Sequence, residues 1–523
     1  NRIWRYGARG LMKNKASHVS LGLFPKFSKI LRPRSNWLQN PRAEILSGLV
    51  VALALIPEAI SFSIIAGVDP KVGLYASFSI AIIITFSGGR SGMISAATGA
   101  MALVVVPLVE EHGVSYLFAA TILAGIIQII FGRIGIGDLM KFIPRTVMVA
   151  FVNALAILIF LAQIPHIFLS DQSDRGNLSM NLVFIGVGLF IIYLFPRLSK
   201  AIPSPLVAIV TVTLLAILFK IDLPTVGDMG ELPNSLPGLS FPNVPFTFEM
   251  LKIIFPYALT LALVGLLESL LTAQLLDDLT DTNSDKNMES RGQGLANLVT
   301  GFLGGMAGCA MVGQSIINYR SGGRTRLSTL SSGIFLLVLV LAFGDFVAKI
   351  PMPVLVAVMI MVSISTFDWS SIRPANLKAI PLTETAVMAT TVGTVLLTHN
   401  LAYGVGVGVL LSAVFFVRNL SGVVRVTTLD SSSSAEQQYL VTGELFFASI
   451  NGLVQAFNYD SFEGEKVKID LSGARIWDTS AVVAIDTVVS KFSERGIATE
   501  LVGLNRHAER LHSKTTGRSS AGH

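Results

Sequence analysis

Long apolar runs recur from Ala43 to about Arg418, and this pattern constrains the fold more than any other feature of the chain. Each run is long enough to cross, or nearly to cross, a bilayer. Of the 523 residues, 52% are hydrophobic and only 14% are charged, against roughly 25% charged in a typical soluble domain. The sequence therefore predicts an all-α polytopic membrane domain and excludes a soluble enzyme of this size, a disordered chain or a fibre. The predicted spans are 44–67, 70–88, 94–110, 114–132, 141–162, 180–196, 203–220, 251–278, 292–305, 310–320, 329–347, 349–366, 383–398 and 401–419.

The distribution of Lys and Arg indicates how the spans are oriented. Every charged residue in the segment 1–42 is Lys or Arg, and basic residues recur in alternate connections further along the chain. Cytoplasmic loops carry this excess, so we expect both termini in the cytoplasm and the protein in a plasma membrane, the inner membrane of a bacterium. Twelve crossings would give the same termini as fourteen. A competing interpretation of 1–42 is an arm that binds nucleic acid. The long apolar runs that follow this segment disfavour it, and we expect no nucleic-acid partner.

Two of the fourteen segments, 94–110 and 310–320, are short and interrupted by small residues. They occupy the third position in two successive blocks of seven, which is typical of transporters with inverted repeats and a site at the membrane midplane. We expect an extended stretch followed by a half-helix in each, with the two helix N-termini facing each other. Unpaired amides and partial positive charge would then form a cradle for an anion. The alternative is a pair of poor helices or re-entrant loops.

The composition changes after Leu420, where the apolar runs end. Segment 421–436 is a Ser-rich polar linker, and 437–512 alternates between strand and helix patterns. Such alternation predicts a small α/β domain with a mostly parallel sheet. The domain organisation is thus a cytoplasmic basic segment 1–42, a transport domain 43–420, the linker, the α/β domain and a disordered tail 513–523. Strands are expected at 438–443, 466–471 and 497–503, and helices at 447–458 and 479–494.

Three motifs carry a resemblance to a known family. They are PRAEILSGLVVALALIPEAISFSIIAGVDPKVGLYASF at 41–78, GGRTRLS at 322–328 and IDLSGARIWDTSA at 469–481. The chain resembles the SulP (SLC26) family of anion transporters over about 41–505, and its C-terminal part is similar to the STAS domain. The resemblance implies fourteen spans in a seven-plus-seven inverted repeat, core and gate subdomains, an elevator-like movement and homodimers. It also implies a small anion substrate, contact with membrane lipid and a cytosolic regulator of the STAS domain.

Two carboxylates within the apolar spans are candidate functional residues, because charge at that depth is expensive. Glu58 directly follows Pro57 and is expected to border the substrate site and to take up a proton; the alternative is a carboxylate that caps broken backbone. Phe62, one turn later, resembles the aromatic residue that lines the family's site, although alone it would be ordinary packing. The resemblance assigns Glu268 to cation coupling, with Thr272 as a further oxygen ligand.

The coupled ion is the only cofactor-like species that the sequence predicts. A hard cation such as Na⁺ near Glu268 would need several oxygen ligands, whereas a lone carboxylate suits H⁺. Gln314 and the segment 310–312 offer few side-chain oxygens, which favours H⁺. An inter-helix hydrogen bond is the structural alternative for Glu268. No other metal and no resident cofactor are expected.

The cradle itself would be formed by the starts of the two half-helices. Many relatives carry a basic pair where this chain has Gly313 and Gln314, so the helix ends would have to supply the positive field, with help from a coupled cation. The same small residues could instead serve tight helix packing. The predicted cradle residues are Thr98, Gly99, Ala100 and Met101 in the first segment and Val312, Gly313, Gln314 and Ser315 in the second.

Other charged clusters have simpler interpretations. The acidic and basic residues of 277–291 are expected to form a solvated face, and Arg320, Arg324 and Arg326 to set orientation and touch lipid headgroups. Asp478 and Ser480 lie where related domains carry a phosphorylated serine, but helix capping is the favoured role.

The leading hypothesis is a secondary-active carrier of sulfate or bicarbonate driven by H⁺ or Na⁺. An uncoupled anion channel or exchanger, a dicarboxylate or nucleobase carrier on the same fold, and a membrane-tethered signalling protein stay open. An enzyme is not expected, because no nucleophile–base pair or metal cluster is visible. The single Cys309 excludes a disulfide framework.

Overall fold

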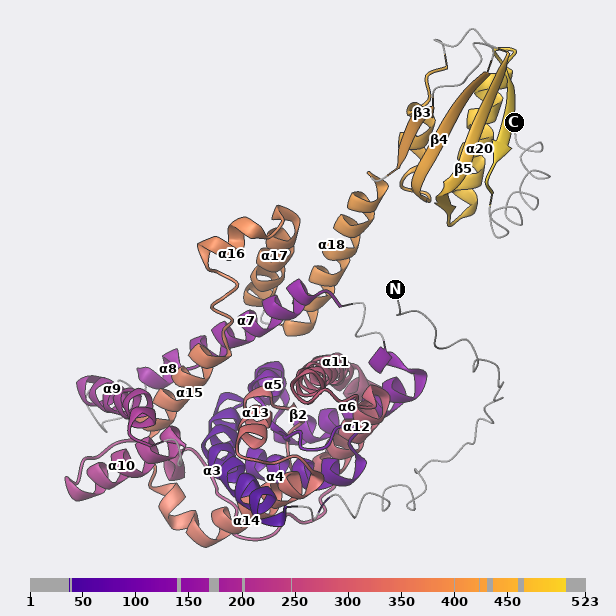
Figure 1. The fold of residues 1–523 in the computed structure, drawn as a ribbon. Helices are drawn as coiled ribbons and strands as arrows, with labels where there is room; N and C mark the ends of the chain where they lie inside the picture. The colour runs from indigo at the N-terminus through magenta and orange to yellow at the C-terminus, as the bar shows by residue number, and fades with distance from the viewer. Residues whose placement is uncertain are drawn as a thin grey trace. The chain divides into compact units, whose positions relative to one another are not determined.

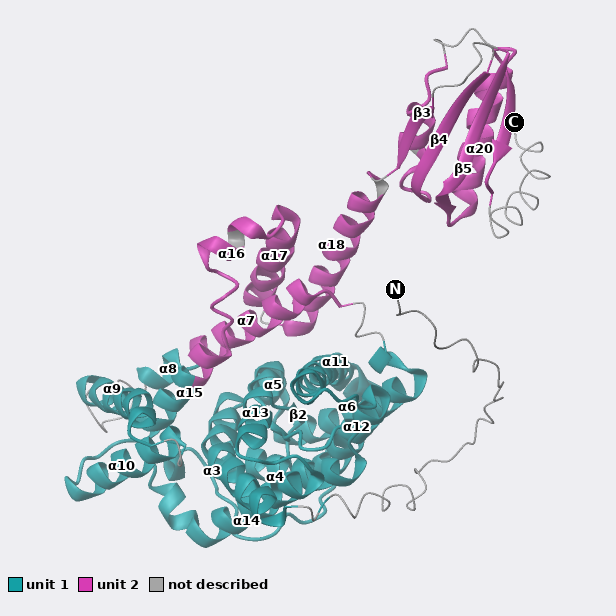
Figure 2. Cartoon of the chain, in the orientation of Figure 1, with its two compact units in different colours: residues 1–140, 162–361 teal, residues 141–161, 362–523 magenta. Residues whose placement is uncertain are grey.

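The computed structural model describes most of the chain, and Figure 1 labels its helices and strands. The basic segment before residue 37 and the tail 513–523 lie outside the described residues. The chain divides into two compact units, coloured teal and magenta in Figure 2: unit 1 comprises 1–140 and 162–361, and unit 2 comprises 141–161 and 362–523. The described residues are 37, 40–138, 143–168, 178–199, 203–245, 247–398, 400–422, 424–429, 436–459 and 465–504.

Each predicted apolar segment coincides with a helix, or with a short strand that continues into a helix. Within the described ranges, eight helices are long and apolar enough to cross a membrane, and three more apolar helices are shorter. In unit 1 the helices are α3 (Pro41–Ile65), α4 (Pro70–Ser87), α5 (Gly99–His112), α6 (Val114–Ile134), α9 (Leu178–Leu194), α10 (Ser204–Leu218), α11 (Phe248–Thr280), α12 (Lys286–Phe302), α13 (Val312–Arg320) and α14 (Arg326–Ala348). Helix α15 (Met352–Thr366) begins in unit 1 and ends in unit 2. In unit 2 they are α7 (Arg145–Leu161), α17 (Leu382–Thr398) and α18 (Leu401–Ser421). The short helices α8 (Ile164–Ile167) and α16 (Pro374–Ala379) lie in connections.

Several helices begin where side chains cap them. The side chains of Asn40, Thr247 and Asp285 accept hydrogen bonds from the amides three residues later, at 3.5, 3.2 and 2.8 Å, at the starts of α3, α11 and α12. Such residues satisfy amides that have no partner within the helix. The helix boundaries are therefore encoded locally, even where the apolar runs extend further.

Glycines let the helices of unit 1 approach each other closely. A Cβ on Gly125 of α6 would lie 2.6 Å from the carbonyl oxygen of Gly294 on α12, and a Cβ on Gly294 would lie 2.6 Å from that of Gly125. A Cβ on Gly73 of α4 would lie 2.2 Å from the hydroxyl oxygen of Ser63 on α3. Contacts this short leave no space for a side chain, so backbone packs against backbone, as is common between membrane helices.

The C-terminal part of unit 2 is a four-stranded sheet with the order β3-β4-β5-β6. Only β3 and β4 pair antiparallel, and Val441, Ile469 and Phe492 are in its buried core. The predicted strands and helices of this domain are confirmed. β3 lies in the segment predicted to be a polar linker, but Val424 and Val426 pack on the core and add a strand there. The elements are β3 (Arg425–Leu429), β4 (Glu436–Leu445), α19 (Ile450–Gln455), β5 (Lys466–Ile476), α20 (Thr479–Ser493) and β6 (Ala498–Val502).

Candidate functional site

Two short strands, both in unit 1, interrupt the third and the tenth of the predicted apolar segments. β1 (Ser95–Ala97) and β2 (Gly308–Ala310) pair antiparallel, with Ala96 opposite Cys309. α5 follows β1 and α13 follows β2, each after one intervening residue. Because the strands are antiparallel, the two helices leave the pair from opposite ends, and their N-termini face each other across it. Figure 1 shows β2 among α5, α11 and α13. The structure confirms the predicted broken segments.

The backbone of β2 is satisfied by polar side chains from α11 and α12. The amide of Gly308 donates to Oδ1 of Asn297 at 2.9 Å, and its carbonyl accepts from Asn297 at 3.0 Å and from Gln293 at 2.9 Å. The amide of Ala310 donates to the hydroxyl of Ser269 at 3.0 Å. Unpaired backbone groups are costly where no water is present. These side chains therefore make an extended backbone tolerable in the middle of an apolar domain.

The first turn of α13 carries amides that no helical bond can satisfy. The first helical hydrogen bond runs from the Ser315 amide to the Met311 carbonyl at 3.0 Å, so the amides of Val312, Gly313 and Gln314 precede it. Gly313 is exposed, and a Cβ placed there would meet no atom within 4 Å. A helix start of this kind offers donors and partial positive charge to an anion. Gly313 is the point at which a ligand can approach the backbone.

Glu58 on α3 lies against this first turn. Its Oε1 accepts a hydrogen bond of 2.7 Å from Nε2 of Gln314, and the two side chains are only 8% and 3% exposed. Oε1 of the Gln314 amide is buried and has no hydrogen-bond partner among the described residues. The structure thus brings together two predicted site residues that are 256 positions apart. It leaves an unpaired acceptor beside them, which costs about 1–3 kcal/mol where water is excluded.

Glu268 on α11 is connected to the start of α5 through a thiol. Sγ of Cys309 donates to Oε2 of Glu268 at 2.9 Å, and the Thr98 hydroxyl lies 3.1 Å from the same sulfur. Thr98 is also the N-cap of α5, where its hydroxyl accepts from the Met101 amide at 3.5 Å. Gly99, Ala100 and Met101 fill the buried first turn of α5. A chain of hydrogen bonds therefore runs from the cap of one half-helix to the predicted coupling residue.

The comparisons with known proteins agree with this architecture. The Sulfate permease family profile matches residues 42–391, and the STAS domain profile matches residues 438–517. The chain belongs to the sulfate permease family. The predicted resemblance and the predicted C-terminal STAS domain are both confirmed, and the relatives are transporters rather than enzymes.

Three similar proteins illustrate the range of the family. YbaR of Bacillus subtilis is 58% identical over 482 residues, which cover 91% of this chain and 98% of YbaR. The bicarbonate transporter BicA of Picosynechococcus is 28% identical over 475 residues, covering 85% of this chain and 80% of BicA. The structure of the murine solute carrier 26 member A9 anion transporter shares the fold, with a TM-score of 0.80 at 18% identity, covering 96% of this chain and 92% of that one.

Three other predicted site residues make contacts within the protein itself. Phe62 is buried on α3, one turn after Glu58. The Thr272 hydroxyl donates to the backbone carbonyl of Glu268 at 2.8 Å, within its own helix. The Ser315 hydroxyl accepts from the Ile94 amide at 3.0 Å. Because these hydroxyls already have partners, the free backbone amides are the main donors that α13 offers.

Sequence reasoning missed the residues that support the strands. Gln293 and Asn297 are four positions apart on α12, so both face β2 from one side of the helix. Two buried amides with this spacing in an apolar span are a signal that could have predicted an extended backbone nearby. The sequence predicted no role for Cys309, yet its thiol joins Glu268 to Thr98.

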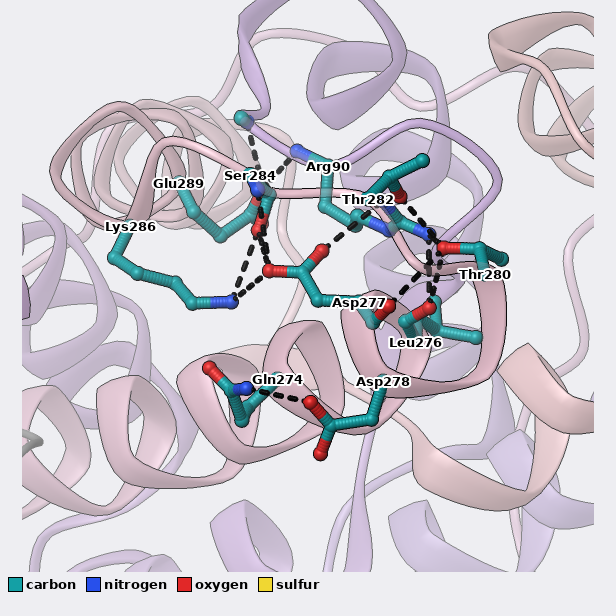
Figure 3. A network of polar contacts seen from close by, with 11 residues as sticks. Arg90, Gln274, Leu276, Asp277, Asp278, Thr280, Thr282, Ser284, Lys286 and Glu289 are labelled. Carbon is teal, nitrogen blue, oxygen red and sulfur yellow. Dashed lines mark hydrogen bonds and ion pairs between the residues drawn. The ribbon is translucent and has the colours of Figure 1, made fainter. Parts of the chain in front are cut away.

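A second polar cluster lies where α11 ends. The expectation of a solvated face holds for Asp278, Asp281, Asp285 and Arg291, which are exposed, but not for Asp277 and Glu289, which are buried. Arg90, after α4, forms an ion pair of 3.0 Å with Asp277, and their side chains are 10% and 6% exposed. Lys286 donates to the other Asp277 oxygen at 2.6 Å, and Arg90 also donates to Thr280 and Thr282 (Figure 3). Burial lowers the pKa of Arg90, and the charge of Asp277 opposes that shift. For Asp277 the expectation was wrong because its burial depends on Arg90, which comes from a distant part of the sequence.

A cavity of about 510 Å³ opens beside this cluster. Its lining includes Ser91, Asn283, Tyr319 and Arg324. The guanidinium carbon of Arg324 lies 3.7 Å from the centre of the Tyr319 ring, a cation–π contact. The structure thus gives Arg324 a partner within the protein in addition to its predicted role at the lipid surface.

Proposed function

We propose that this protein is a secondary-active transporter of small inorganic oxyanions, of the sulfate or bicarbonate class. The main support is the strand pair β1/β2, from which α5 and α13 start in opposite directions. Main-chain amides at helix starts bind anions by charge and size rather than by identity. The family's description and the name of BicA suggest the two anions to test first.

We propose further that transport is coupled to H⁺ or Na⁺. The cradle residues 312–315 contain no Lys or Arg, so no side chain among them supplies positive charge to an anion. A cation taken up at the same time would offset the cost of bringing that charge into an apolar domain. Glu268, with Cys309 beside it and Thr272 one turn on, is the site proposed for that cation. H⁺ is favoured, because few side-chain oxygens surround the carboxylate.

The wider setting belongs to the same proposal. The basic segment 1–42 and the basic alternate loops favour a plasma membrane, the inner membrane in a bacterium, with both termini in the cytoplasm. Membership of the family favours an elevator-like movement of a core against a gate, and homodimers. The STAS domain is a candidate binding site for a cytosolic regulator.

The decisive experiment is uptake into proteoliposomes that contain the purified full-length protein. Labelled sulfate, bicarbonate and dicarboxylates are compared under imposed proton and sodium gradients, with protein-free vesicles as the reference. We expect one inorganic anion to accumulate under one gradient, and Glu268→Gln to abolish that accumulation. Flux that ignores both gradients and survives Glu268→Gln would identify a channel or exchanger. No uptake of any anion would overturn the proposal.

A further inference from the structure

The contact between Gln314 and Glu58 has a chemical direction. A glutamine amide has a donor end and an acceptor end, and here the donor end faces Glu58 while the acceptor end has no partner. This orientation suits an ionised carboxylate, which can only accept hydrogen bonds. Gln314 lies in the same turn of α13 as the free amides of Val312 and Gly313. An amide oxygen turned away from Glu58 is unfavourable for an anion bound at that turn.

We propose that Gln314 is a positioning residue that couples the protonation of Glu58 to anion binding. When Glu58 is protonated, the side-chain amide of Gln314 rotates, and this rotation changes which group faces the anion site. A protonated Glu58 becomes a donor, and it is satisfied when Oε1 of Gln314 rotates toward it. The rotation exchanges the two ends of the amide with little movement of heavy atoms. The N–H groups then replace the unpaired oxygen and can donate to the anion. Protonation and anion binding therefore each favour the other, which is the requirement for symport.

The surroundings of Glu58 leave Gln314 as its main polar partner. The elements packed against α3 are α4, α5, α10, α13, α14 and β1. Among their described residues, the titratable and charged groups lie toward helix ends, and β1 and α10 carry none. These groups are Lys71 and Tyr75 on α4, Glu110, Glu111 and His112 on α5, Tyr319 and Arg320 on α13, and Arg326 and Asp345 on α14. Gln314 is thus the residue that links the charge state of Glu58 to the first turn of α13.

This inference rests on the proposed function, because it needs an anion that the protein takes up. The experiment measures initial uptake of labelled sulfate and labelled bicarbonate into proteoliposomes between pH 5.5 and 8. One coupled proton changes apparent anion affinity by up to about tenfold per pH unit. Glu58→Gln always presents an N–H donor to Gln314, as the protonated acid does. We expect this variant to transport with less than about twofold dependence on pH across the range, and to lose proton-driven accumulation.

A double-mutant cycle separates an effect through Gln314 from a direct effect of Glu58. In Gln314→Leu we expect at least roughly tenfold lower uptake. Adding Glu58→Gln to Gln314→Leu should change neither the uptake rate nor the pH profile of that variant. The reason is that Gln314, the residue that responds to the protonation of Glu58, has already been removed. Gln314→Met serves as a second apolar variant, and elution as a single peak in gel filtration shows that each variant is folded. Dividing the uptake rate of each variant by that of the wild type at the same pH cancels the effect of bicarbonate's own change of protonation.

Four outcomes are decisive. A flat profile in Glu58→Gln, with no further change when Glu58→Gln is added to Gln314→Leu, supports the inference. Wild-type pH dependence in Glu58→Gln overturns it but leaves anion transport standing, as does an effect of Glu58→Gln that persists in Gln314→Leu. Absence of uptake by the wild type overturns the proposed function and this inference with it.

Discussion

The thiol of Cys309 donates a hydrogen bond of 2.9 Å to the carboxylate of Glu268, joining β2 to the middle of α11. The Thr98 hydroxyl lies 3.1 Å from the same sulfur. The cap of α5 and the proposed coupling residue therefore share one polar partner. A change in the charge or position of Glu268 acts directly on the strand from which α13 starts.

This relationship predicts different effects for two substitutions of Cys309. Cys309→Ser keeps a donor and should retain uptake within about twofold of wild type. Cys309→Val removes it, and the loss of a hydrogen bond to a charged group costs about 1.5–3 kcal/mol. We expect the valine variant to reach half-maximal uptake at a roughly tenfold or more lower concentration of the driving cation, because the ionised carboxylate that takes up the cation is destabilised. Measuring uptake against imposed cation gradients tests this, and equal behaviour of the two variants would contradict it.

The second prediction concerns the close approach of the strands. A Cβ on Gly308 would lie 2.2 Å from the carbonyl oxygen of Ala96, so Gly308→Ala must force the strands apart. Overpacking of this kind costs about 1–3 kcal/mol or more, and we expect a lower midpoint of thermal unfolding in detergent. Gly313→Ala is the control, because a Cβ there meets open space. Its stability should change by less than about 0.5 kcal/mol, and equal losses in the two variants would show that β1 and β2 are not paired this tightly.

Much of the fold could be predicted from the sequence because it depends on local patterns. The lengths of the apolar runs predicted the spans, and the matching positions of segments 94–110 and 310–320 predicted the break in each. Glu58 and Glu268 were identifiable because a carboxylate within an apolar run is rare and costly. Their partners were not, because contact between Glu58 and Gln314 depends on how two distant helices pack.

The other misses have the same physical origin. Cys309 lies in a strand of three residues, too short to show the alternation that would reveal which way its side chain points. Asp277 looked solvated because its neighbours are charged, and only Arg90, from a distant segment, makes its burial tolerable. β3 has four exposed residues among its five, so its pattern resembles a polar linker.

The third prediction compares two adjacent aspartates at the end of α11 (Figure 3). Asp277 is buried and bonded to Arg90 and Lys286, whereas Asp278 is exposed and accepts a hydrogen bond from Gln274. Removing one partner of a buried ion pair costs about 3–5 kcal/mol, so Asp277→Ala should sharply lower thermal stability and the yield of folded protein. Asp278→Ala should stay within about 0.5 kcal/mol of wild type. Similar stabilities for the two variants would mean that Asp277 is solvated in the working protein.

The last prediction concerns the start of α20, where Asp478 and Ser480 are candidates for helix capping and for phosphorylation. Oδ1 of Asp478 accepts from the Ala481 amide at 2.9 Å, and Oδ2 accepts from the Phe447 amide at 2.8 Å. Asp478→Ala should therefore destabilise the start of α20 by about 1 kcal/mol, measured as faster amide hydrogen exchange there in the full-length protein. Asp478→Asn keeps an acceptor and should lose less. Ser480→Ala is the matched control and should leave exchange unchanged. If Ser480→Ala instead loosens the helix as much as Asp478→Ala, the cap is shared, and phosphorylation at Ser480 would then alter the fold of the domain itself.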